Sequence, residues 1–113
     1  MSWQNYIDDL IKKGFTHAAI HDQENYSVAY SPSFNITRDE VFGIQAAFSK
    51  GGNITVSGKN YSVTKSLDVL YAPNLIIHKT KRYFAIGVYD KISESDATRF
   101  MKDLADYFNS VGY

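Results

Sequence analysis

The sequence of 113 residues has no cysteine, which excludes a disulfide framework, a thiolate metal site and a cysteine nucleophile. It has no excess of either charge, because 12 basic side chains balance 12 acidic ones. Bulk electrostatics therefore favour neither nucleic acid nor a generic anionic membrane as a partner. The sequence also lacks an apolar run approaching the ~20 residues that a membrane-spanning helix needs.

Recognisable catalytic and metal-binding motifs are missing as well. His17 and His21 point the same way on a strand or a helix, but no third ligand is evident, so we interpret them as strand-face residues. The segment 52–59 differs from a phosphate-binding loop in its glycine spacing, and Asn60 stands where Ser or Thr would bind Mg²⁺. There is no Gly-x-Ser-x-Gly motif. We therefore expect no enzymatic activity, no metal site and no cofactor.

The pattern of apolar residues predicts three helices. The first covers about residues 2–13, with Ser2 as its N-cap. Thr37 is expected to cap a second helix that ends at Gly51-Gly52, and Ser93 to begin a third. The expected inward stripe of the third helix is Ala97, Phe100, Met101, Leu104, Phe108 and Val111.

Strands are expected between these helices. Residues 16–22 and 26–31 alternate in polarity and are joined by a predicted turn at Asp22-Gln23-Glu24-Asn25, and short strands fill 54–89. No linker, repeat or low-complexity segment divides the chain, so we expect one domain over residues 1–113. The order of elements predicts an α+β domain, in which helices pack on an antiparallel sheet.

Large aromatic side chains are concentrated at both ends of the chain. Chain ends are usually polar and frayed, so rings there need something to cover them. If the terminal helices lie side by side, part of this surface packs between them and the rest forms a shallow groove. Such a groove suits an extended ligand rich in proline. The residues concerned are Trp3, Tyr6, Tyr107, Phe108 and Tyr113.

This arrangement resembles the profilin family, and the resemblance covers nearly the whole chain. The opening MSWQ-Y-DD and the closing LADY segment followed by Gly-Tyr are both typical of profilins. Phe34-Asn35-Ile36-Thr37 with Glu40 resembles the entry into the second helix of a profilin. Gly58-Lys59-Asn60-Tyr61 and Lys79-Thr80-Lys81 resemble a strand start and a strand end of that family.

The resemblance implies a particular version of the α+β fold. It is a profilin-like central antiparallel β-sheet with the N- and C-terminal helices packed together on one face and a further helix on the other. It also implies a monomeric, cytoplasmic protein of the cytoskeleton that binds monomeric actin and regulates its polymerisation.

The resemblance further implies a proline-rich-peptide groove formed by Trp3, Tyr6, Tyr107 and Tyr113, with Phe108 as a supporting wall. Ring faces contact pyrrolidine, while indole N–H and phenol O–H groups donate hydrogen bonds to the carbonyls of the ligand. The chain departs from the family on its second strand. Profilins usually carry a groove tryptophan there, whereas this chain has Ala29.

A second binding face is implied for actin. Its matching positions in this chain are Phe48, Lys65, Lys79, Lys81, Thr98 and Arg99. The loop that is Gly-rich and basic in many profilins is replaced here by the shorter segment 70–74. The resemblance also implies phosphoinositide lipids as partners, and this short loop makes that binding weak.

Other functions are compatible with the same elements. One is a profilin-fold module that binds proline-rich peptide, with weak or no actin binding. Another is a small sensor domain, which would require an internal ligand cavity rather than exposed terminal rings. A small hydrolase is a third, and activity on esters or phosphates would reveal it.

Overall fold

The computed structural model describes residues 2–24 and 27–113. Seven strands form one antiparallel sheet in the order β2-β1-β7-β6-β5-β4-β3. The strands are β1 His17–Asp22, β2 Ser27–Tyr30, β3 Gly52–Val56, β4 Lys59–Ser66, β5 Val69–Ala72, β6 Leu75–Lys79 and β7 Tyr83–Val88. The helices are α1 Trp3–Lys12, α2 Arg38–Lys50 and α3 Glu94–Ser110. The expected α+β class is confirmed, although Asn25 of the predicted turn and residue 26 lie outside the described residues.

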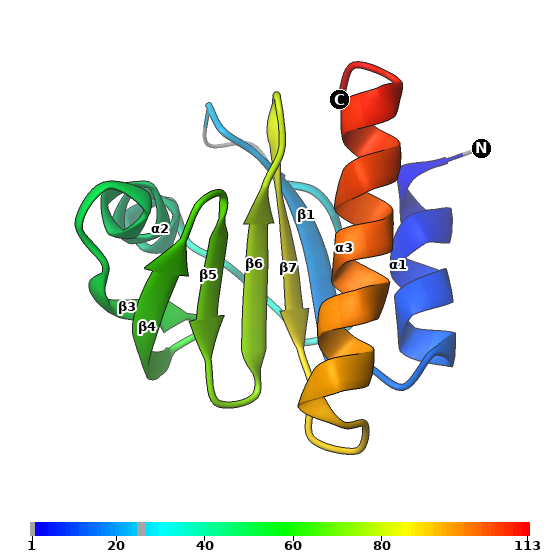
Figure 1. The fold of residues 1–113 in the computed structure, drawn as a ribbon, viewed down its shortest axis with the longest axis horizontal. Coiled ribbons are helices and arrows are strands. Elements are labelled where there is room, and N and C mark those ends of the chain that lie inside the picture. Colours follow the sequence, from blue (N-terminus) through cyan, green and yellow to red (C-terminus); the bar gives the residue numbers. More distant parts are fainter. Residues whose placement is uncertain (1, 25–26) are drawn as a thin grey trace.

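The helices cover both faces of the sheet. Figure 1 shows α1 and α3 side by side, with the start of α1 and the end of α3 at the same end of the pair. The helix α2 packs on the opposite face, mainly against β3, β4 and β5. Each face has its own cluster of buried apolar side chains. The predicted distribution of the three helices is therefore confirmed.

Strand alternation divides side chains between the two clusters. On β6, Leu75 and Ile77 pack in the cluster under α2, whereas Ile76 packs in the cluster under α1 and α3. Because successive side chains of a strand point to opposite faces, a central strand covered on both faces has a continuous apolar sequence. This is why β6 reads Leu-Ile-Ile without a polar residue between them.

Local capping explains where two helices begin. The Thr37 hydroxyl accepts from the Glu40 N–H and the Glu40 carboxylate accepts from the Thr37 N–H, which completes the capping box of α2. The Ser93 hydroxyl accepts from the Asp96 N–H at the start of α3. Ser2 occupies the N-cap position of α1, but its side chain makes no capping hydrogen bond.

The inward face of α3 differs in part from the predicted stripe. Ala97, Met101 and Phe108 are buried as expected, and Ala105 joins them. The prediction for Val111 is wrong, because its side chain is 45% exposed. The helix ends at Ser110, so Val111 leaves the helical direction and no longer shares the inward face.

The Glu40 carboxylate links α2 to the turn between β3 and β4. Besides capping α2, it accepts hydrogen bonds from the Ser57 N–H at 3.0 Å and the Gly58 N–H at 2.9 Å. A helix start and a hairpin turn are thereby held by one side chain. This contact aligns α2 with the strands that it covers.

We expect Glu40→Ala to lower the free energy of unfolding by about 2–3 kcal/mol, since it removes a cap and two further bonds to a charged acceptor. Asp39→Ala is the matched control, because Asp39 lies in the same helical turn and is exposed. Urea denaturation of both variants tests this expectation. Equal losses would show that the bonds from Glu40 to the turn contribute nothing.

Candidate binding surfaces

The two terminal helices bring their aromatic rings into one cluster. The centroid of the Trp3 ring lies 4.9 Å from that of Tyr113 and 5.7 Å from that of Phe108. Tyr6 contacts Phe108 at 5.2 Å and Tyr107 at 6.1 Å. All five residues predicted for the proline-rich-peptide groove therefore belong to one cluster, between the start of α1 and the end of α3 (Figure 1).

Main-chain hydrogen bonds hold Tyr113 in this cluster. Its carbonyl oxygen accepts from the Arg82 N–H at 2.6 Å and from the Thr80 hydroxyl at 3.0 Å. Its own N–H donates to the Phe108 carbonyl. The β6–β7 turn thus holds Tyr113, three residues after the end of α3, so that its ring contacts Trp3.

The rings of the cluster differ in exposure. Tyr107 is 48% exposed, whereas Trp3, Tyr6 and Tyr113 are half-buried. Phe108 has no exposed surface. It packs beneath the other rings, so any part it has in the groove is that of the supporting wall expected above.

The Tyr6 hydroxyl is suited to hydrogen bonding with a ligand. Burial among the neighbouring rings, and then a hydrogen bond with Tyr107, raise the pKa of Tyr6 above its usual value. A phenol is protonated at neutral pH in any case, and the raised pKa extends this range to more alkaline pH. A protonated phenol can donate to a carbonyl of a peptide that has no N–H groups of its own to satisfy it.

A ring on the sheet also joins the cluster. Tyr83, at the start of β7, places its ring 4.8 Å from Trp3 and 6.3 Å from Tyr113. Sequence reasoning missed this residue, although its position two residues after the Lys79-Thr80-Lys81 motif was a usable signal. Ala29, at the usual tryptophan position of profilins, is buried beneath α1 and adds no ring.

Comparison of the whole sequence with known protein families identifies the family of this chain. Residues 1–113 match the family model described as Profilin. The chain belongs to the profilin family. It is 29% identical to the profilin of Bombyx mori over 126 residues, covering all of both chains, and equally identical to profilin-1 of Dictyostelium discoideum.

Solved profilin structures agree with this assignment. Profilin IB of Acanthamoeba castellanii superposes with a TM-score of 0.90 at 27% identity, covering 99% of this chain and all of the other. Profilins are actin-binding proteins without enzymatic activity, as expected from the missing motifs, and a cytoplasmic location is typical of them. No helix within residues 2–24 and 27–113 is long and apolar enough to cross a membrane.

The predicted actin-binding residues of this profilin come from several elements: α2 and α3, the strands β4 and β6, and the β6–β7 turn. Lys79 and Thr98 line the same cleft between α3 and the sheet. Lys65 pairs across the strands with Leu70, whose side chain packs under α2, so Lys65 leaves the sheet on the α2 face. Arg99 is exposed and forms an ion pair with Asp96 at 3.3 Å, and the exposed Lys81 lies in the β6–β7 turn.

The structure places Phe48, which is expected to contact actin, almost entirely within the core. Its side chain is 6% exposed and its ring stacks on Phe84, with centroids 5.5 Å apart and planes inclined by 10°. It therefore belongs to the core under α2 and offers almost no surface to a partner. The inward stripe of a helix is the face that packs against the core, so an apolar residue on it is normally buried.

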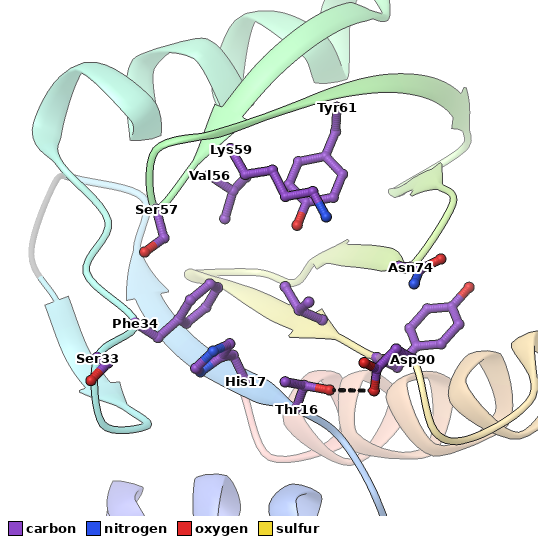
Figure 2. Close-up of a pocket in the computed structure, with 12 residues that line it drawn as sticks. Thr16, His17, Ser33, Phe34, Val56, Ser57, Lys59, Tyr61, Asn74 and Asp90 are labelled. Atoms are coloured by element: carbon purple, nitrogen blue, oxygen red, sulfur yellow. Dashed lines mark hydrogen bonds between the residues drawn. The ribbon is translucent and has the colours of Figure 1, made fainter.

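An open hollow of about 350 Å³ lies between the start of β1, the β3–β4 turn and the residues that follow β7 (Figure 2). The His17 ring stacks on Phe34, Lys59 lies over the Tyr61 ring, and Asp90 accepts from the Thr16 hydroxyl at 3.0 Å. A small-ligand sensor would use such a hollow. Ligand pockets are usually enclosed and mostly apolar, whereas this one is open and mixes both charges with hydroxyl groups.

His78 is a buried polar residue that the sequence did not single out. It lies on β6 under α3, and its Nε2 atom has no hydrogen-bond partner among the residues that the structure describes. Burial lowers the pKa of its imidazole below the usual 6.5. The ring of another histidine, His17, contacts the Ser31 hydroxyl. Within the described ranges, no cluster of His, Cys, Asp and Glu side chains could hold a metal ion.

The lowered pKa of His78 predicts a stability that depends on pH. Below about pH 6.5 the unfolded chain binds a proton that the folded chain resists, so the free energy of unfolding falls as the pH falls towards the lower folded pKa. We expect His78→Leu to show a flatter dependence between pH 5 and pH 7. Urea denaturation at several pH values measures it, and identical slopes for both proteins would contradict this assignment.

Proposed function

We propose that this profilin binds proline-rich segments of other proteins in the groove between α1 and α3, and monomeric actin through a separate surface, thereby regulating actin polymerisation. The observation that carries the proposal is the convergence of Trp3, Tyr6, Tyr107 and Tyr113, joined by Tyr83, at the junction of the terminal helices. These rings are only partly buried, so part of their apolar surface is free to contact a ligand.

Complexes of other profilins support both parts of the proposal. Mouse profilin IIa has been solved with a double repeat from the FH1 domain of mDia1, and LokiProfilin2 with rabbit actin. Their identities to this chain, 18% and 13%, support a common fold and leave the binding residues to be tested here.

The groove has the physical properties that a proline-rich helix requires. A polyproline segment is already extended and stiff, so it loses little conformational entropy when it binds. The inclined rings of Trp3 and Tyr113 give it apolar surface, and the phenols of Tyr6 and Tyr107 can donate hydrogen bonds. Because Phe108 and Tyr83 support Trp3 from below, little reorganisation is needed on binding.

The actin surface is proposed to lie on the other flank of α3. It includes Thr98 and Arg99 of α3, Lys79 and Lys81 at the β6–β7 turn, and Lys65 at the edge of the α2 face. Basic side chains favour encounter with the acidic surface of actin. The same lysines are proposed to bind phosphoinositide headgroups weakly. The protein is proposed to act as a monomer in the cytoplasm and cytoskeleton.

We expect Tyr107→Ala to weaken binding of a proline decamer by about 1 kcal/mol, the usual effect of removing one exposed ring contact. The single tryptophan, Trp3, lies in the proposed groove, so its emission should report the titration. Tyr30→Ala is the control, because Tyr30 is equally exposed at 49% but lies on β2, on the face turned away from α1. Equal affinity of the Tyr107 and Tyr30 variants would place the peptide elsewhere.

The wild-type protein is expected to slow spontaneous polymerisation of pyrene-labelled actin, and more strongly at low salt. Arg99→Glu should weaken this effect, because it places a carboxylate opposite the acidic groups of actin, while leaving peptide binding intact. Lys12→Glu, an equal change of charge on the exposed face of α1, serves as the control. An inert wild-type protein would refute the actin part of the proposal and leave the peptide part standing.

A further inference from the structure

The turn between β4 and β5 contains an unusual leucine. Leu67 follows the last residue of β4 and is 87% exposed. Its φ angle is +52°, in the left-handed region. The side chain therefore gains nothing from burial, and the backbone adopts a conformation that a leucine disfavours.

The neighbouring turns show how this chain builds the same geometry elsewhere. The β5–β6 turn places Asn74 at φ +68°, and the β3–β4 turn pairs Ser57 with Gly58. Asparagine and glycine tolerate positive φ, which is why they dominate such turns. Leu67 is the one large apolar side chain among the positive-φ residues within 2–24 and 27–113. A residue that breaks the local rule without helping the fold is a candidate for a functional contact.

Leu67 stands at the mouth of a cleft on the α3 face. The cleft, of about 270 Å³, separates α3 from the β4–β5 turn. Its lining includes Leu67, Val69, Lys79, Thr98 and Lys102. Lys79 and Thr98 are two of the residues proposed above to meet actin, so Leu67 extends that surface with an apolar group.

The cleft is distinct from the peptide groove. Both border α3, but the proposed groove involves rings of α1 and α3, whereas the cleft is lined by residues of α3, β5 and β6. A peptide in the groove therefore leaves Leu67 uncovered.

We propose that Leu67 is an apolar anchor for monomeric actin, which covers its side chain when it binds over the cleft. This inference rests on the proposed actin binding. A buried apolar anchor surrounded by charged and polar contacts is the usual composition of a binding hot spot. The unfavourable turn conformation is then compensated in the complex, where the leucine leaves water.

The decisive variant is Leu67→Asn, because the fold and the complex should respond in opposite directions. Asparagine suits the positive φ, so the melting temperature should stay the same or rise. The Kd for monomeric actin, measured by isothermal titration calorimetry, should rise about tenfold, since the apolar contact is lost. The affinity for the proline decamer should not change. Ile11→Asn, the same kind of change on the exposed side of α1, should leave the actin Kd unaltered.

The possible results separate this inference from the proposed function. Equal actin affinity of wild type and Leu67→Asn overturns the role of Leu67 and leaves actin binding standing. A wild type that does not bind actin overturns both. A wild type that self-associates, with self-association lost in Leu67→Asn and actin binding unchanged, identifies a second copy of the chain as the occupant and also overturns the inference.

A second pair of variants tests the inference even if Leu67→Asn proves less stable than the wild type. Leu67→Met and Leu67→Gln have side chains of similar length and differ in polarity. The methionine variant should retain most of the actin affinity and the glutamine variant should lose it. Equal affinities of these two variants would show that no apolar contact is made.

Discussion

The packing of Phe108 against both terminal helices and the sheet is the contact on which the binding surfaces depend. Its ring has no exposed surface and lies within contact distance of Trp3, Tyr6, Tyr83 and Tyr113. Because these rings share one buried neighbour, α1, α3 and the start of β7 cannot shift independently. The proposed peptide groove is therefore the outer surface of a core contact. Its rings are held in position before any ligand arrives, which reduces the cost of binding.

The position of α3 on the sheet creates two surfaces with different chemistry. On one side the helix meets α1, and aromatic rings fill the junction. On the other side it faces β5 and β6, where charged, polar and apolar side chains together line a cleft. A single helix thus borders both proposed sites, one on each of its flanks.

Much of the fold could be predicted from the sequence because its signals are local. The capping box of Thr37 and Glu40 determines the start of α2, and the apolar spacing of Ala97, Met101 and Phe108 identifies the inward face of α3. The sequence is less informative where the local periodicity ends or where burial depends on how elements cross. Val111 fits the helical stripe, but the helix ends before it. Phe48 was assigned by family position, whereas its stacking on Phe84 depends on how α2 crosses the sheet.

The sequence by itself determined the family, the order of helices and strands, and the gathering of aromatic residues at both chain ends. Only the tertiary structure decided which of those rings face solvent. Tyr107 and Phe108 are adjacent in the chain, yet one is half exposed and the other fully buried. The inclusion of Tyr83 in the ring cluster and the proximity of Leu67 to Thr98 were likewise decided by strand register and helix placement. These features join residues far apart in the chain, and local sequence patterns carry information only about neighbours within a turn or along a strand.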